Sequence, residues 1–139
     1  MNKIFSIFTL CVVPAWALAA EQVQIGTVLQ RPAEYHLHVI TLHGVVSQVQ
    51  SAGDIYNNKY ASVCLGAYTF ILRDDSGSIA VEVPSICARS QDSIPLVKEN
   101  QTVNIDARIE ASGWYAGQGR PLGELVSATR AVAVKIELE

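Results

Sequence analysis

Aromatic and basic residues gather in two long stretches of the chain, 51–66 and 112–129, that lack regular hydrophobic alternation. Aromatic rings can stack on planar or apolar ligand groups, and cationic side chains can pair with negative charge. Long, glycine-containing loops with aromatic residues are often functional. The candidates for ligand binding from these stretches are therefore Tyr56, Lys59, Tyr60, Trp114, Tyr115 and Arg120. A seventh candidate, Arg73, lies on a predicted strand between the two stretches and could also meet negative charge on a ligand. The alternative is that the rings pack as lids over the ends of the fold.

The three histidines could suggest a metal site. In an extended strand His36 and His38 share one face, whereas His43 has the opposite parity and points away from them. Two imidazoles without a carboxylate or thiol partner do not complete a ligand set. We expect the histidines to lie at the surface or at the ends of the fold, and we expect no metal and no cofactor. A histidine-based metal or haem protein is less favoured than a protein that binds a ligand or a protein partner.

The chain lacks a recognisable set of catalytic residues. It contains neither GxSxG nor HExxH. The adjacent carboxylates of Asp74 and Asp75 precede Ser76 and Gly77, which is a turn sequence rather than an acid–base pair. The sequence therefore predicts a protein that is not an enzyme.

Residues 1–19 have the pattern of a secretory signal peptide. Lys3 precedes an apolar run that ends at Pro14, and Ala17 and Ala19 supply the small residues that a signal peptidase reads. The run is too short to span a bilayer, which takes about 20 residues. We expect cleavage after residue 19, no membrane span in the mature chain, and a periplasmic or secreted protein.

Cleavage changes both the charge and the cysteine count. The whole chain has 10 basic and 13 acidic residues and a net charge of -3, and loss of Lys3 makes it more acidic. Such a charge is not typical of a general nucleic-acid binder. Cys64 and Cys87 remain in a compartment that permits disulfides, and without a CxxC spacing one structural bridge is favoured over thiol redox chemistry.

The strongest local signal is a β-hairpin on either side of Asp74–Gly77. Apolar residues alternate on both sides of this turn, and a register centred on it pairs Leu72 with Ile79, Phe70 with Val81 and Tyr68 with Val83. Continued outward, the same register places Cys64 opposite Cys87. The predicted disulfide would close a loop of about 24 residues, for roughly 3 kcal/mol of stabilisation on the chain-entropy model.

The rest of the chain also alternates with a period of two. A long extended stretch, 37–50, has Gly44 at its centre, where glycine typically marks a bend. Residues 102–111 form a strand with one buried face, and near the end of the chain we expect Val132, Val134, Ile136 and Leu138 to face the core. Helical spacing is confined to 25–29 and a short turn from Pro32 to Tyr35. The pattern predicts one all-β domain, a small five-stranded barrel with a short N-terminal helix.

The segments 25–35, 39–46 and 68–79 resemble the OB-fold domains found in anticodon-binding proteins and in small exported bacterial proteins. The resemblance extends from about Ile25 to Leu138 and implies a five-stranded Greek-key OB-fold domain over 20–139. One departure is the segment 84–100, which has two prolines and a cysteine where many OB-folds have a helix. OB-folds generally bind ligands on their second and third strands, between the loop joining strands one and two and the loop joining strands four and five.

The predicted hairpin provides that face. Its outward side chains are Thr69, Ile71, Arg73, Ser78, Ala80 and Glu82, and none is aromatic. It is therefore not a conventional platform for stacking bases. We expect a binding module that holds an oligonucleotide, an oligosaccharide or a peptide between the two loops, with nucleic acid implied only by the resemblance. The alternative is a subunit of a cell-envelope complex that binds a protein partner.

Overall fold

The computed structural model describes residues 22–51, 56–57, 63–65, 67–84, 86–88, 96–117 and 123–139. Only the backbone is described at 51, 56–57, 63–65 and 86–88. The predicted signal peptide lies outside the described residues. Among the helices that are described, none has the length and apolar character needed to cross a membrane.

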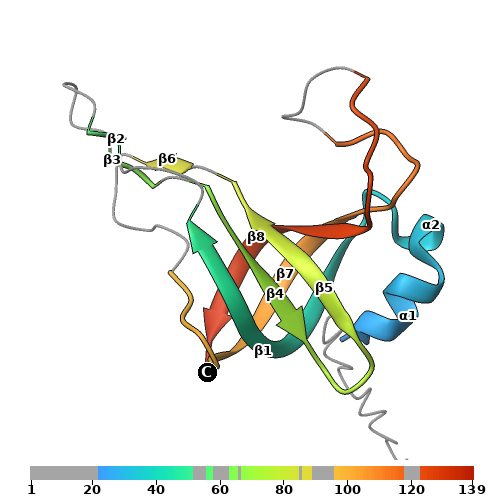
Figure 1. Ribbon diagram of the computed structural model, residues 1–139, viewed down its shortest axis with the longest axis horizontal. Coiled ribbons are helices and arrows are strands. Elements are labelled where there is room, and N and C mark those ends of the chain that lie inside the picture. Colours follow the sequence, from blue (N-terminus) through green and yellow to red (C-terminus); the bar gives the residue numbers. More distant parts are fainter. Residues whose placement is uncertain are drawn as a thin grey trace, which may run out of the picture.

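In the described part of the chain, two short helices precede eight strands (Figure 1). The helices are α1 (Ile25–Gln30) and α2 (Pro32–Tyr35), as the sequence predicts for this region. The strands are β1 (Val39–Ser51), β2 (Tyr56–Asn57), β3 (Val63–Leu65), β4 (Tyr68–Arg73), β5 (Ser78–Val83), β6 (Ile86–Ala88), β7 (Thr102–Glu110) and β8 (Arg130–Leu138).

Five strands close into a barrel in the order β1-β4-β5-β8-β7. Strands β5 and β8 are parallel, and the other neighbours are antiparallel. The first half of β1 pairs with β7 and its second half pairs with β4, so this strand turns the corner of the barrel. The all-β OB-fold prediction is confirmed.

Gly44 lies at that corner, as expected from the sequence. A Cβ atom at this position would lie 2.5 Å from the carbonyl oxygen of Arg73. Any other residue would therefore push β4 away from β1. A register shift between Ser47 and Gln50, with Gln48 at a φ of 52°, bends the strand further.

The predicted hairpin register is confirmed along its whole length. Strands β4 and β5 pair Tyr68 with Val83 and Leu72 with Ile79. Beyond them β2, β3 and β6 form a separate three-stranded sheet, in which the backbones of Cys64 and Cys87 lie directly opposite each other. Figure 1 shows this sheet projecting away from the barrel. The disulfide itself stays a prediction.

The core fills the barrel with side chains from all five barrel strands. Phe70, Leu72, Leu42, Ile105 and Ile109 are among its largest members, and α1 adds Ile25 and Val28 at one end. The expectation for the last strand is wrong in part. Val132 and Ile136 are buried, but Val134 is 54% exposed because a bulge between Asp106 and Ala107 shifts the register and places Ala131 and Ala133 inside. Leu138, the last residue of the strand, is exposed as well.

The β4–β5 turn also holds α1 against the barrel. Asp74 Oδ2 accepts a hydrogen bond from the Ile25 backbone N–H at 2.8 Å, and Ser76 Oγ accepts one from the Gly26 N–H at 2.7 Å. Asp74 Oδ1 accepts bonds from the Ser76 and Gly77 backbones within the turn. This carboxylate therefore shapes the turn and caps the helix from a distant part of the sequence.

Candidate functional site

The candidate ligand-binding face is the outer surface of β4 and β5. The burial pattern of both strands alternates, so Thr69, Ile71 and Arg73 face outward on β4, and Ser78, Ala80 and Glu82 face outward on β5. The face carries hydroxyl, methyl and charged groups and no aromatic ring. It is bordered at β8 by Arg130, which lies opposite Ala80.

A second hairpin adjoins this face. Residues 111–117 and 123–129, here called the 111–129 hairpin, connect β7 to β8. Its two arms are joined by backbone hydrogen bonds from Gly113 to Val126 (2.8 Å), from Val126 to Trp114 (2.9 Å) and from Ala116 to Glu124 (2.9 Å). The loop that joins strands four and five of the barrel is therefore a ladder that holds its side chains in defined directions.

Two of the predicted aromatic residues stand exposed on this hairpin. The side chain of Trp114 is 51% exposed and that of Tyr115 is 66% exposed, so neither is a buried lid. Tyr115 and Leu125 are bridge partners and share one face of the ladder. Trp114 lies on the other side, where its ring centroid is 5.1 Å from that of His36. The two rings therefore stand on the same ordered hairpin and on opposite faces of its ladder.

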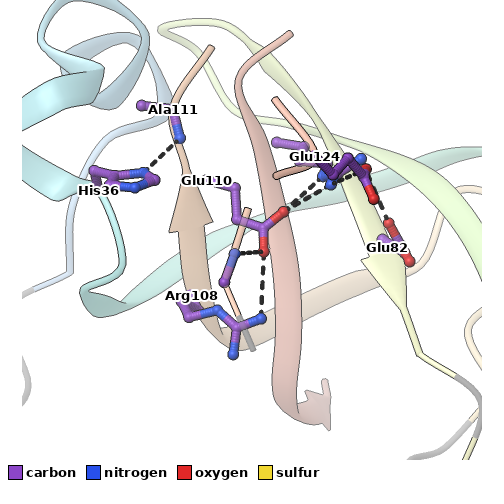
Figure 2. Close-up of polar contacts among 8 residues, drawn as sticks. His36, Glu82, Arg108, Glu110, Ala111 and Glu124 are labelled. Atoms are coloured by element: carbon purple, nitrogen blue, oxygen red, sulfur yellow. Dashed lines mark hydrogen bonds and ion pairs between the residues drawn. The ribbon is translucent and has the colours of Figure 1, made fainter. Parts of the chain in front are cut away.

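A buried carboxylate anchors the hairpin to the barrel (Figure 2). Glu110, the last residue of β7, is 0% exposed. Its Oε2 lies 2.8 Å from Nε and from Nη2 of Arg130, and its Oε1 accepts hydrogen bonds from the Gly117 N–H (3.1 Å) and from Arg108 Nη2 (3.3 Å). One side chain therefore joins β7, β8 and the hairpin.

Arg130 extends this network toward the binding face. Its Nη2 lies 3.4 Å from Glu124 Oε1, and its Nη1 lies 4.0 Å from Glu82 Oε2. Burial disfavours the charged form of Glu110, but hydrogen bonds from Arg130, Gly117 and Arg108 outweigh it and lower the pKa of the carboxyl. Burial likewise disfavours the charged form of Arg130, but Glu110 outweighs that effect and raises the pKa of the guanidinium. Both groups are therefore charged at neutral pH.

Gly117 allows the hairpin to approach the barrel this closely. A Cβ atom here would lie 2.9 Å from Arg108 Nε and 3.1 Å from Leu37 Cδ2. The backbone therefore lies directly against the guanidinium of Arg108. Arg108 Nε is buried and has no hydrogen-bond partner among the described residues.

The histidines have structural contacts. His36 Nδ1 accepts a hydrogen bond from the Ala111 N–H at 3.1 Å, which fixes the start of the 111–129 hairpin. His43 Nε2 lies 3.4 Å from Glu139 Oε1. Within the described ranges, no group of three or more His, Cys, Asp or Glu side chains could hold a metal ion.

The predicted site residues are brought together only in part. Trp114 and Tyr115 are neighbours on the hairpin, and the backbone of Tyr56 belongs to β2. Arg73 is exposed at the turn end of β4, about 16 Å along the strand from the end that follows the first loop. Lys59, Tyr60 and Arg120 lie outside the described residues.

Glu110 is a site residue that the sequence did not predict. Strand alternation over 102–111 predicts a solvent-facing side chain at this position. A usable signal was the spacing of charges: Arg108 lies two positions earlier on the same face, and Arg130 begins the next strand. A carboxylate at a strand end between two such arginines, next to a glycine-rich loop, favours a buried ion pair.

Comparison with known proteins supports the fold. No protein-family model matches the chain, and no curated protein sequence matches it significantly. The structure is similar to a solved aspartyl-tRNA synthetase from Leishmania major Friedlin, with a TM-score of 0.54 and 15% sequence identity. The similarity covers 91% of this chain and 22% of that chain, so this chain corresponds to a small part of the larger protein. The described barrel is an OB-fold.

Proposed function

We propose that this chain is an exported, non-enzymatic OB-fold binding module. It holds an oligomeric ligand on the outer face of β4 and β5, between the loop that precedes β4 and the 111–129 hairpin. The observation that carries the proposal is the exposure of Trp114 and Tyr115 on a hairpin that Glu110 fixes to the barrel. Exposing two large rings on an ordered element is useful when a ligand covers them.

The charges near the site and on the whole chain bear on which class of ligand it binds. The similar synthetase is, by its description, a tRNA enzyme, which makes a single-stranded nucleic acid the first ligand to test. Against it, Arg108 and Arg130 already pair with carboxylates, and the whole chain carries a net charge of -3. An oligosaccharide or a peptide requires no phosphate-binding cations and fits the same rings.

Trp114 offers a direct test. The chain has two tryptophans, Trp16 in the predicted signal peptide and Trp114, so Trp114 is the only one left after the expected cleavage. Its emission should shift when a ligand of the correct class is added, and calorimetry should show at least a tenfold loss of affinity for Trp114→Ala or Tyr115→Ala. Val134→Ala, which removes an exposed side chain from β8, is the control and should bind normally. If oligonucleotides, oligosaccharides and peptides all fail to bind at low salt, the proposal is wrong.

A protein partner in the cell envelope is the second candidate. It is favoured by the apolar side chains of Leu125 and Leu37, which are exposed near the two rings. A photo-crosslinking amino acid at position 115 should then capture one partner of defined mass in intact cells, whereas the same group at position 137 should not. Equal labelling from both positions would count against this candidate.

A further inference from the structure

Two guanidinium groups converge on one buried carboxylate at the base of the 111–129 hairpin. Arg130 approaches Glu110 to 2.8 Å and Arg108 approaches it to 3.3 Å (Figure 2). Paired arginines around a single group of oxygen acceptors are a common way for proteins to bind phosphate. Here the acceptor is a side chain of the protein itself.

The outer part of this arginine pair is also occupied. Glu124 and Glu82 take the remaining face of Arg130, at 3.4 Å and 4.0 Å. Three carboxylates thus share two guanidiniums, which leaves this cluster with one excess negative charge. An incoming phosphate would have to compete with all three.

One member of the pair, Arg130, lies beside the proposed binding face, and Arg108 is linked to it through Glu110. Arg130 begins β8 opposite Ala80, an outward residue of the β4–β5 face. The side chains of Arg108 and Arg130 are each about one quarter exposed, so a modest rearrangement could turn them toward solvent. Arg108 Nε, which lacks a partner among the described residues, shows that Glu110 does not use all the donors available.

We propose that Glu110 is a specificity-determining residue of this site. Its carboxylate occupies Arg108 and Arg130 from within and so withholds both guanidiniums from the phosphates of a ligand. The module therefore selects against nucleic acid in favour of oligomers without phosphate. This inference rests on the proposed function and concerns which ligand the same site accepts.

The test uses charge-matched variants of the mature chain that remains after the expected cleavage. Glu110→Gln removes one negative charge inside the cluster, and Glu137→Gln removes one on the outside of β8, where Glu137 pairs with Lys135. The probe is a ten-nucleotide oligothymidylate. We expect Glu110→Gln to bind it at least fivefold more tightly than the parent at low salt, with a salt dependence steeper by roughly one phosphate contact. Glu137→Gln should behave like the parent.

A second variant leaves the Glu110 anchor of the hairpin intact. Glu124→Gln removes the carboxylate that contacts Arg130 Nη2, and it should show a smaller gain in affinity. Titration of this variant with inorganic phosphate should move the NMR signals of the Arg130 Nη–H groups, which a purely structural role for the carboxylates would leave unchanged.

The possible failures can be told apart. Tight oligothymidylate binding by the parent would overturn the inference and leave the binding-module proposal supported. Gains that are equal in Glu110→Gln and Glu137→Gln, or absent from both Glu110→Gln and Glu124→Gln, would also overturn it. If the parent binds none of the tested ligands, the proposed function is refuted. The gain in affinity of Glu110→Gln for oligothymidylate can still be measured in that case.

Discussion

Strand alternation predicts that the charged side chain of Glu110 faces water. In the folded protein it is fully buried. Burying a carboxylate costs several kcal/mol unless its lone pairs are satisfied. Here two arginines and the Gly117 amide supply donors to both oxygens. The cost is therefore offset only when β7, β8 and the hairpin are all in place, which makes this one residue a sensitive reporter of the arrangement.

Replacing Glu110 should destabilise the protein in a pH-dependent way. Glu110→Gln leaves Arg130 without its main counter-charge, and removing one partner of a buried pair costs about 3 kcal/mol at neutral pH. The folded-state pKa of Glu110 is lowered from 4.5. Its contribution is therefore complete above that value and is lost as the pH falls below it, through the lower folded-state pKa.

Urea unfolding of the parent and the Glu110→Gln variant at several pH values measures this contribution. The difference in unfolding free energy should be largest at neutral pH and should shrink at acidic pH. Glu137→Gln, an exposed carboxylate, is the control and should change stability by less than about 1 kcal/mol. A Glu110→Gln variant as stable as the parent at neutral pH would show that the carboxylate does not anchor the hairpin.

At the scale of elements, the β4–β5 turn connects two parts of the chain that are distant in sequence. Asp74→Ala removes the acceptor of the Ile25 amide and the internal bonds of the turn. We expect a loss of about 1–2 kcal/mol and faster hydrogen exchange at the Ile25 and Gly26 amides. Asp75→Ala alters the exposed neighbouring carboxylate and should have little effect. Unchanged exchange at Ile25 in Asp74→Ala would show that α1 does not depend on this cap.

The elements that the sequence predicts well are those whose determinants are local. The β4–β5 register follows from a turn and its flanking apolar residues, and the corner of β1 follows from Gly44. The prediction for β8 is confirmed at Val132 and Ile136, which are buried, and is wrong at Val134, where a bulge against β7 shifts the register. The ladder of the 111–129 hairpin could not be predicted, because its position depends on Glu110 and Arg130, which meet only in three dimensions.

At the scale of the whole molecule, barrel closure limits how a partner can bind. Every strand of the closed barrel pairs on two sides, so the barrel has no open edge to which a peptide could add as a further strand. On the barrel itself, a partner would therefore have to contact side chains of the outer face and of the 111–129 hairpin, whereas β2 and β6 are edge strands of the separate sheet. The acidic charge of the chain favours neutral or cationic partners over polyanions. The excess negative charge of the cluster around Glu110 favours the same partners.

The last prediction concerns the compartment in which the molecule folds. The backbone of the small sheet places Cys64 opposite Cys87, and an exported chain would meet an oxidising environment. We predict that protein recovered from that compartment has a mass two hydrogens lower than the reduced form. Reduction, or the double replacement Cys64→Ser with Cys87→Ser, should lower the unfolding free energy by roughly 3 kcal/mol. Cys11→Ser is the control and should change neither result, because Cys11 belongs to the predicted signal peptide. Free thiols at both positions in the exported protein would contradict the bridge, and retention of the full chain in the cytoplasm would contradict the export on which it depends.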